Sequence, residues 1–471
     1  MAMQVALGVC RVNPNPLMTI KNVSVRCLAT QASPKSKTVQ DKTGKNIVFV
    51  DGVRTPFLPS GTGYQKLMPH ELARHALLNL SRRTGIPREA VQYIVYGTVI
   101  QEVKTSNIAR DSALCAGFSE RIPAHTVTHA CLSSCQAITS GIGLIASGAY
   151  DVVVAGGVET MSDVPIRLNR NLRSILLKMN KAKTPMAKLK LLASFSPKYL
   201  APELPAVAEF TSGETMGKSA DRLSAAFTVS RQEQDDYARR SHQLAHEAHE
   251  KGYLTDIVPF PIPGSSKVVS RDEGVRVSDP EKLAKLKPAF IKPHGTVTAA
   301  NASFLTDGAS ASIIMPEKKA KELGVKPKAY LRDYIYVSQD PVHQLLLGPA
   351  YAIPEVLARA GLTIEDIDVW EIHEAFAGQI LANLKAMDSD WFAKTHMNRS
   401  EKVGVPDLAK WNTWGGSLSI GHPFAATGVR LVSHAANRLI KEGGRYALVA
   451  ACAAGGQGVA MIIERHPDAS M

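Results

Sequence analysis

The 471 residues are 45% hydrophobic and 21% charged, which at roughly 100–200 residues per domain indicates about two to four domains and excludes wholesale disorder. Six cysteines in this length exclude a disulfide scaffold, so each thiol needs its own explanation by packing or by reactivity. The net charge of +13 comes from two segments, since residues 1–45 carry +6 and residues 167–200 carry +9. The rest of the chain is nearly neutral, which excludes a general nucleic-acid-binding surface.

The first forty residues have the composition of a targeting segment. They contain no Asp or Glu but carry spaced basic residues, which is typical of a mitochondrial transit peptide. A secretory signal would place its charges before the apolar run, whereas here Arg11 follows that run. We expect residues 1–45 to be a mitochondrial leader, with a merely disordered terminus as the alternative, and structure to begin near Lys45.

Two segments without Asp, Glu, Lys or Arg, residues 122–150 and 446–463, predict the buried core. The first is expected to hold a helix enclosed by protein and then a buried strand. The second is interrupted by glycines, so two buried strands joined by a turn fit it better than a membrane span of about 20 apolar residues. A weak echo between residues 88–101 and 364–377 predicts two related α/β halves.

An insertion of different character separates the predicted halves. It contains the basic run 167–200, a Pro-rich hinge at 201–205 and a charged helix around 230–252. Residues 295–310 then return the chain to the core. We expect an N-terminal half of residues 46–166 and 290–322, a loop domain of residues 167–289, and a C-terminal half of residues 323–471.

Four side chains are candidates for chemistry. Cys131 stands where small polar residues are followed by a predicted helix, and a helix N-terminus stabilises a thiolate. The alternative is packing, because a cysteine taken alone is more often a small buried hydrophobic residue. His422 lies in a Gly/Pro loop that suits a general base. His373 follows a strand-like run and could equally be a satisfied buried histidine. Cys452 ends a buried strand beside a glycine turn.

Metal and nucleotide sites have no support in the sequence. There is no Cys-x-x-Cys pair, so we expect no metal site. There is also no G-x-G-x-x-G or Walker sequence, so the sequence gives little support to a loop that binds nucleotide phosphates.

Taken together, the motifs around these residues resemble the thiolase family. The matching segments are the Cys-x-Ser sequence at Cys131, HEAF at 373–376, GHP at 421–423 and CAAGGQG at 452–458, supported by VAGGVETMS and GTVTAANAS. The resemblance covers about residues 46–466. HEAF in place of the commoner NEAF, together with the leader-like N-terminus, places the chain nearest to the long-chain 3-ketoacyl-CoA thiolases of mitochondrial fatty-acid β-oxidation.

The resemblance implies an α/β fold, a five-layer αβαβα sandwich of two similar halves with an inserted loop domain. It implies that Cys131 is the nucleophile that carries the acyl group, and that His422 activates it as a base. Cys452 would be the general acid and base. His373 would hold an oxyanion water, and the backbone N–H of Ala454, which stands where the family often has Gly, would complete an oxyanion site.

The resemblance also implies ligands and partners. Coenzyme A would be a substrate rather than a resident cofactor, with Ala299 and Ser303 near its pantetheine. The chain would form a homodimer within a hetero-oligomer with a hydratase/dehydrogenase α subunit, peripheral to the matrix side of the inner membrane. The basic, apolar-patterned insert 167–200 predicts an amphipathic helix for anionic lipid, with subunit packing or attraction for CoA phosphates as alternatives.

Other functions remain to be weighed against thiolysis. A decarboxylating ketoacyl synthase or an HMG-CoA synthase would pair its cysteine with His/His or Glu constellations, whereas here a second cysteine, Cys452, occupies the acid/base position. A non-catalytic scaffold or a lipid- or membrane-binding relative of the fold would not need two cysteines and two histidines in these motifs. We therefore expect an acyltransferase.

Overall fold

A computed structural model describes residues 38–206 and 208–470. Most of the predicted leader lies outside this part of the chain. Its last residues form a short helix, α1 (Val39–Thr43), whose N-terminus is capped by the Thr38 side chain. The Lys45 ammonium group then donates to the carbonyl oxygen of Ile145 at 2.7 Å. The folded part therefore begins before residue 46.

The strands repeat one arrangement twice. The N-terminal strands are β1 (Ile47–Arg54), β3 (Tyr93–Gly97), β4 (Ala124–Val127), β5 (Val153–Glu159) and β8 (Thr306–Pro316). The C-terminal strands are β9 (Ala329–Ser338), β10 (Val369–Ile372), β11 (Tyr446–Ala453) and β12 (Gln457–Arg465). The strands of the first set lie in the order β1-β8-β5-β3-β4, and those of the second set in the order β9-β12-β11-β10. In each set the strands at the outer end pair in parallel, and the other neighbours pair antiparallel. The prediction of two similar α/β halves is confirmed.

The two sets join into one sheet through β1 and β9. Only two residue pairs make this junction, Val48 with Tyr330 and Phe49 with Ala329. A short strand, β2 (Leu58–Pro59), is added on β8, and a separate small hairpin consists of β6 (Phe260–Pro261) and β7 (Val268–Val269). The predicted strand–glycine turn–strand at 446–463 is confirmed as β11 and β12.

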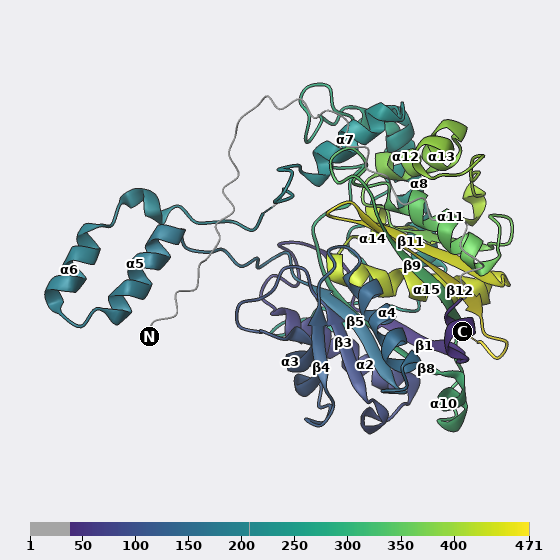
Figure 1. The fold of residues 1–471 in the computed structure, drawn as a ribbon, viewed down its shortest axis with the longest axis horizontal. Coiled ribbons are helices and arrows are strands. Elements are labelled where there is room, and N and C mark those ends of the chain that lie inside the picture. Colours follow the sequence, from purple (N-terminus) through teal and green to yellow (C-terminus); the bar gives the residue numbers. More distant parts are fainter. Residues whose placement is uncertain (1–37, 207, 471) are drawn as a thin grey trace, which may run out of the picture. The chain divides into compact units, whose positions relative to one another are not determined.

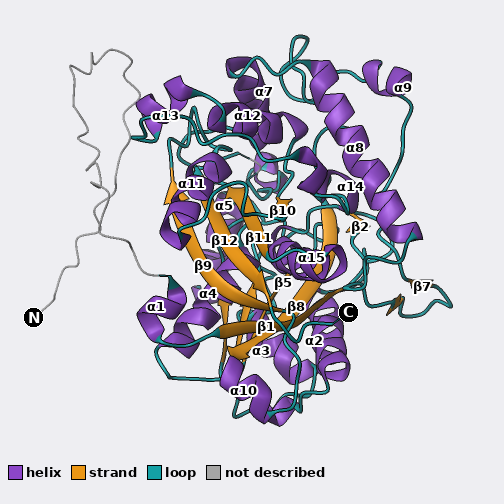
Figure 2. Ribbon diagram, turned by 90° about the vertical axis from the view of Figure 1, so that its right-hand side faces the viewer, coloured by secondary structure: helices purple, strands orange, loops and turns teal. Residues whose placement is uncertain are grey.

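Helices cover both sets of strands and also lie between them (Figures 1 and 2). One outer layer holds α2 (Pro69–Thr84) and α3 (Ile108–Cys115), and the other holds α11 (Gly348–Ala360) and α12 (Ala377–Met387). The central layer holds α4 (Ser133–Ala146) and α15 (Thr427–Glu442), which pack on each other and on the strands of their halves. This arrangement is the expected five-layer sandwich. Because strands enclose α4, it needs no charged residue, as its sequence predicts.

The remaining helices lie in the predicted loop domain or in connections. Those of the predicted loop domain are α5 (Arg170–Lys181), α6 (Pro185–Ala193), η2 (Pro197–Leu200), α7 (Met216–Ala226), α8 (Arg231–Glu250) and α9 (Pro280–Ala284). The others are η1 (Arg88–Ala90), α10 (Glu317–Glu322), α13 (Asp390–His396), η3 (Leu408–Lys410), α14 (Ser417–Ile420) and η4 (Phe424–Ala426). Helices α7 and α8 pack against α12, and α8 also contacts α14.

Helices α5 and α6 form a hairpin that projects from the sheet (Figure 1). They pack mainly against each other and against η2. Among the residues that the structure describes, no helix is long and apolar enough to cross a bilayer.

Candidate active site

The backbone before α4 aims the Cys131 side chain. Ala130 has a φ of +45°, which is unusual for a residue with a side chain, and the chain then enters α4. The Ser133 hydroxyl fixes this turn, because it accepts from the His129 N–H at 2.9 Å and donates to the Ala130 carbonyl at 2.7 Å. Cys131 thus lies beside the helix N-terminus, where the sequence predicts it.

His422 is held by a turn that requires glycine. Gly421 has a φ of +107°, and a Cβ there would come within 2.8 Å of the Thr306 hydroxyl. The His422 N–H donates to that same hydroxyl at 3.1 Å, and its Nδ1 lies 2.7 Å from the Thr427 hydroxyl. The imidazole is buried, and its Nε2 has no hydrogen-bond partner.

His373 leaves the end of β10 and meets His422. Its N–H continues the pairing of β10 with β11 by donating to the carbonyl of Ala450 at 2.9 Å. Its Nδ1 lies 2.9 Å from the Ser417 hydroxyl, and its Nε2 is buried without a partner. The centres of the two imidazole rings are 4.1 Å apart.

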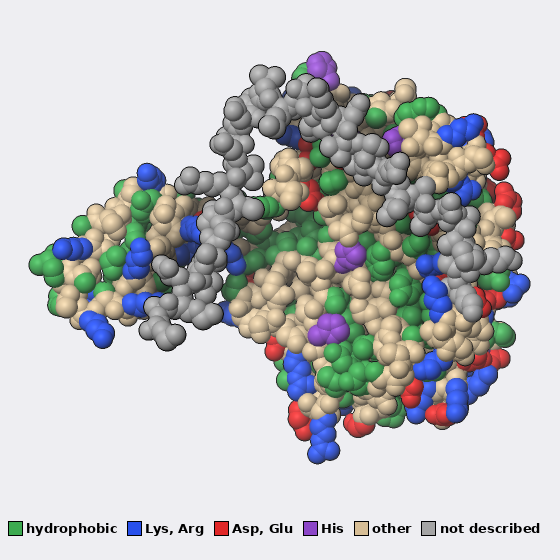
Figure 3. Space-filling model, viewed as in Figure 1, with side chains coloured by type: hydrophobic (Ala, Val, Ile, Leu, Met, Phe, Trp, Pro, Cys, Tyr) green, Lys and Arg blue, Asp and Glu red, His purple; other side chains and the backbone are tan. Residues whose placement is uncertain are grey.

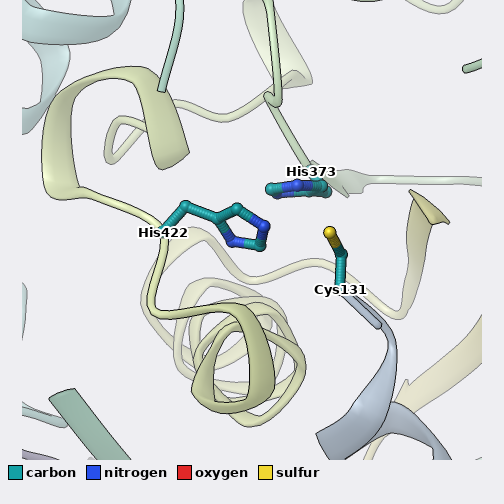
Figure 4. Close-up of side chains that lie close together, drawn as sticks. All are labelled: Cys131, His373 and His422. Atoms are coloured by element: carbon teal, nitrogen blue, oxygen red, sulfur yellow. The ribbon is translucent and has the colours of Figure 1, made fainter. Parts of the chain in front are cut away.

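The nucleophile and the two histidines converge. The Cys131 sulfur and one nitrogen from each of His373 and His422 all lie within 4.8 Å of one another. Figure 4 shows the sulfur pointing toward both rings. Within the described ranges, this set is the one cluster of Cys, His, Asp or Glu side chains that is close enough to hold a metal ion. The same short distances allow a proton to pass from the thiol to an imidazole.

Cys452 and Ala454 approach the same sulfur. Cys452 lies near the end of β11, where burial raises the pKa of its thiol, and ionisation of Cys131 would raise it further. Burial raises the pKa of the Cys131 thiol, and the backbone N–H groups of Cys131 and Ala454 act in the opposite direction. Ala454 is not among the described non-glycine residues with positive φ, so alanine fits at a position where the thiolase family often has glycine.

Burial keeps the site in its neutral protonation state. Desolvation raises the pKa of Cys131 to about 12 despite the two N–H groups, with a further contribution from the Glu159 carboxylate. Burial, with the nearby Arg430 charge, lowers the pKa of His373 to about 3. Burial also lowers the pKa of His422 well below its usual value. At neutral pH the resting site therefore holds a thiol and two uncharged imidazoles.

The segment predicted to contact CoA lies between the two histidine loops. The Ser303 N–H donates to the carbonyl of Ala375 at 2.9 Å, and Leu305 forms a bridge with His422. Ala299 lines a cavity of about 390 Å³, whereas Ser303 is not among the lining residues. The cavity is lined by Pro59, Ala238, Arg239, His242, Gly274, Arg276, Ser278, Lys282, Leu283, Leu286, Ala299, Ala300, Ala302, Phe304 and Leu418.

Sequence reasoning missed the cationic side chains of this cavity. Arg239 lies on α8, and its buried Nε has no hydrogen-bond partner. Arg276 and Lys282 lie further along the chain. His242 Nδ1 accepts from the Arg276 N–H at 3.0 Å, and burial lowers the pKa of this histidine to about 4. The charged helix predicted at 230–252 was the available signal, but it did not indicate which face of the helix meets the cavity.

Glu374 of the HEAF motif also has a role that the sequence did not reveal. Its buried carboxylate accepts from Tyr237 at 3.0 Å, from Ser241 at 2.7 Å and from Asn412 at 2.7 Å. The Leu418 N–H donates to it at 3.3 Å. Glu374 thus links α8 to the loop that carries His422.

Comparisons with known proteins agree with this geometry. Residues 47–318 match the family model described as thiolase, N-terminal domain, and residues 325–465 match thiolase, C-terminal domain. Among solved structures, human mitochondrial 3-ketoacyl-CoA thiolase in complex with CoA is similar, with a TM-score of 0.76 and 29% identity over 92% of this chain and 100% of that one.

Curated relatives are similar over nearly their whole length. The mitochondrial trifunctional enzyme subunit beta is 66% identical in Rattus norvegicus and 65% in Homo sapiens, over 93% of this chain and 92% of each relative. A probable 3-ketoacyl-CoA thiolase of Caenorhabditis elegans is 60% identical over 92% of this chain and 96% of the relative. The two family models together span most of the described residues, and on these grounds the chain belongs to the thiolase family.

Proposed function

We propose that this chain is a 3-ketoacyl-CoA thiolase, an acyltransferase that cleaves long-chain 3-ketoacyl-CoA with CoA into acetyl-CoA and a shortened acyl-CoA. The observation that carries the proposal is the convergence of the Cys131 sulfur with His373 and His422, with Cys452 beside it. Relatives named for the same activity support it. No resident cofactor is required.

The first step is a proton transfer from Cys131 to His422. Thr427 donates its hydroxyl proton to the carbonyl oxygen of Pro423 at 3.2 Å, so its oxygen accepts the Nδ1–H of His422. The lone pair of His422 then lies on Nε2, which has no other partner. Because thiol and imidazole are both uncharged at rest, the proton moves as the sulfur attacks the C3 carbonyl carbon of the substrate.

Carbon–carbon cleavage follows. The C2–C3 bond breaks, its electron pair passes to C2, and the resulting enolate of acetyl-CoA takes a proton from the Cys452 thiol. The acyl group remains on Cys131 as a thioester. Backbone N–H groups of Cys131 and Ala454 would stabilise one oxyanion, and His422 and His373, with a water that His373 holds, would stabilise the other. The Cys452 thiolate then deprotonates incoming CoA, whose sulfur attacks the acyl thioester. The shortened acyl-CoA is released, and the departing Cys131 thiolate takes back its proton from His422.

A direct assay tests this function. Purified protein is incubated with 3-ketohexadecanoyl-CoA and CoA, and acetyl-CoA and tetradecanoyl-CoA are quantified by mass spectrometry. With CoA present, we expect equal amounts of both products. Without CoA, we expect no product beyond the acetyl-CoA of a single turnover. Release of carbon dioxide in place of acetyl-CoA would instead favour a decarboxylating synthase, and no product would favour the non-catalytic scaffold.

The cationic cavity supports binding of the CoA phosphates. We expect Arg239→Gln to raise KM for CoA about tenfold and to leave kcat nearly unchanged, because a charge-assisted bond to a phosphate remote from the reacting atoms binds ground and transition states equally. Steady-state kinetics with CoA as the varied substrate measure this. The matched control is Arg271→Gln, which removes an exposed cation of the same domain that pairs with Glu250. A fall in kcat alone would contradict the assignment.

The relatives' names also suggest location and partners. We propose that the protein is mitochondrial and works as a homodimer within a hetero-oligomer with a hydratase/dehydrogenase α subunit. Residues 1–45 would be the leader, 46–166 with 290–322 and 323–471 the two halves, and 167–289 the loop domain.

We further propose that the α5–α6 hairpin binds anionic lipid on the matrix side of the inner membrane. Residues 167–200 carry nine Lys or Arg and no acidic residue. Leu177, Met186 and Leu189 are each at least 60% exposed, so apolar groups accompany the cations. Figure 3 shows apolar and cationic side chains side by side on this hairpin. Such a surface combines hydrophobic insertion with attraction to negative headgroups.

Liposome flotation tests the hairpin. At about 1 kcal/mol per cation, replacing Lys181, Lys188 and Lys190 by Ser should weaken binding to cardiolipin-containing vesicles about a hundredfold. The control replaces three exposed lysines outside the hairpin: Lys318, Lys326 and Lys394. Equal binding by both triple variants would reject the lipid role.

A further inference from the structure

The proposed reaction requires the two adjacent histidines to be in opposite tautomers. His422 must present a lone pair at Nε2 to take the Cys131 proton, whereas His373 must present an N–H at Nε2 to stabilise developing negative charge. Both rings are uncharged at neutral pH, so each can carry its proton on either nitrogen. The partner of Nδ1 decides which nitrogen carries it.

The contacts of Ser417 set the tautomer of His373. Arg430 donates from Nη2 to the Ser417 oxygen at 2.8 Å, and His373 Nδ1 lies 2.9 Å from the same oxygen. A guanidinium can only donate, so the serine oxygen is the acceptor in the first contact. The serine proton remains, and His373 Nδ1 is the acceptor that these contacts offer it. All three side chains are buried.

The opposite tautomer would leave a group unpaired. If Nδ1–H of His373 donated to Ser417, the serine oxygen would accept twice and its own proton would be buried without a partner. That arrangement incurs the full desolvation cost of the hydroxyl, and it would also place two lone pairs, from His373 and His422, toward the same small space. The hydrogen bonds therefore favour the form of His373 with its proton on Nε2.

Arg430 is itself held in place. It lies on α15, and its Nη1 is 3.5 Å from the Glu371 carboxylate, which also accepts from Arg438 at 2.7 Å. Glu371 is on β10, two residues before His373. This ion pair connects Arg430 to β10, while its hydrogen bond is the one from Nη2 to Ser417.

Resting on the proposed thiolase reaction, we propose that Arg430 and Ser417 are positioning residues that fix His373 with its proton on Nε2, as a donor to the oxyanion. This explains how a histidine can stand where the thiolase family commonly has asparagine. An asparagine side chain always carries N–H groups and needs no such relay, whereas a histidine becomes a donor at Nε2 only when Nδ1 is made the acceptor.

A double-mutant cycle separates this role from a structural one. Ser417→Ala is measured in the wild-type and in the His373→Asn backgrounds, with kcat and KM for thiolysis of 3-ketohexadecanoyl-CoA. We expect kcat to fall about tenfold in the wild-type background with KM unchanged, because part of one oxyanion donor is lost. In the His373→Asn background the same substitution should change kcat less than about twofold, since the amide donates without Ser417.

The controls keep the test decisive. Ser419→Ala removes another buried hydroxyl of α14, one that contacts Ser241 and Gly416 but neither histidine, and it should leave kcat within about twofold. Equal losses from Ser417→Ala in the two backgrounds, or no loss in either, would overturn the relay. Absence of thiolysis in the wild-type protein would instead reject the proposed function and is seen before any variant is made.

Discussion

Cys131→Ala is expected to lower thiolysis of 3-ketohexadecanoyl-CoA by about 10⁴-fold or more, the size of effect seen when a covalent nucleophile is removed. Neither neighbouring thiol can replace it. Cys135 is wholly buried one turn into α4, and Cys452 needs its proton for the enolate. Product formation measured by mass spectrometry gives the rate.

The acyl-enzyme provides an independent readout of the same prediction. Wild-type protein given 3-ketohexadecanoyl-CoA without CoA should gain the mass of one tetradecanoyl group, and Cys131→Ala should gain none. Cys135→Ala is the matched control, because it removes a buried cysteine four residues away that contacts neither histidine, and it should acylate normally. Acylation that persists in Cys131→Ala would move the nucleophile elsewhere.

Arg54→Met is expected to lower the free energy of unfolding by about 3–5 kcal/mol, because it leaves two carboxylates buried without their partner. Arg54 Nε lies 2.7 Å from Asp256, and its Nη1 lies 2.6 Å from Asp272, with all three side chains buried. The Arg54 charge lowers the pKa of Asp272 to about 2, and that of Asp256 also falls. These pairs join β1 to the segment between α8 and α9.

Urea denaturation followed by circular dichroism measures this loss. The control is Lys251→Ala, which removes an exposed pair with Glu247 and should cost less than about 1 kcal/mol. Since the folded-state pKa of Asp272 is depressed, the stability that its pairing contributes is present above pH about 4 and is lost as the pH falls toward 2. A variant as stable as the control would show that the buried pairs contribute nothing net.

Much of the fold could be predicted because its signals are local. The charge-free stretches at 122–150 and 446–463 are buried helix and strands, and the echo between 88–101 and 364–377 corresponds to β3 and β10, which occupy equivalent places in the two halves. The sequence could not reveal that α1, inside the predicted leader, packs on the folded part, because its contacts with β9 and the Lys45 contact to Ile145 join residues far apart in the chain.

The candidate site, like the fold, could be predicted only in part. Cys131, His373, His422 and Cys452 stand in motifs of unusual composition, so their positions could be read from the sequence. Thr427, Ser417 and the cavity arginines have ordinary neighbours, and their roles follow only from tertiary distances such as the 2.9 Å between Ser417 and His373. Ser303, which a motif predicts to lie near CoA, is not among the residues that line the cavity, and its contact with CoA stays a prediction.

The central helical layer has a consequence for how such a protein could arise. Each half contributes one helix to it, α4 or α15, and each leaves that helix exposed unless the other half is present. Cys131 belongs to the first half, and the two histidines belong to the second. A chain with one half alone would have to pair with a copy of itself to hide this layer.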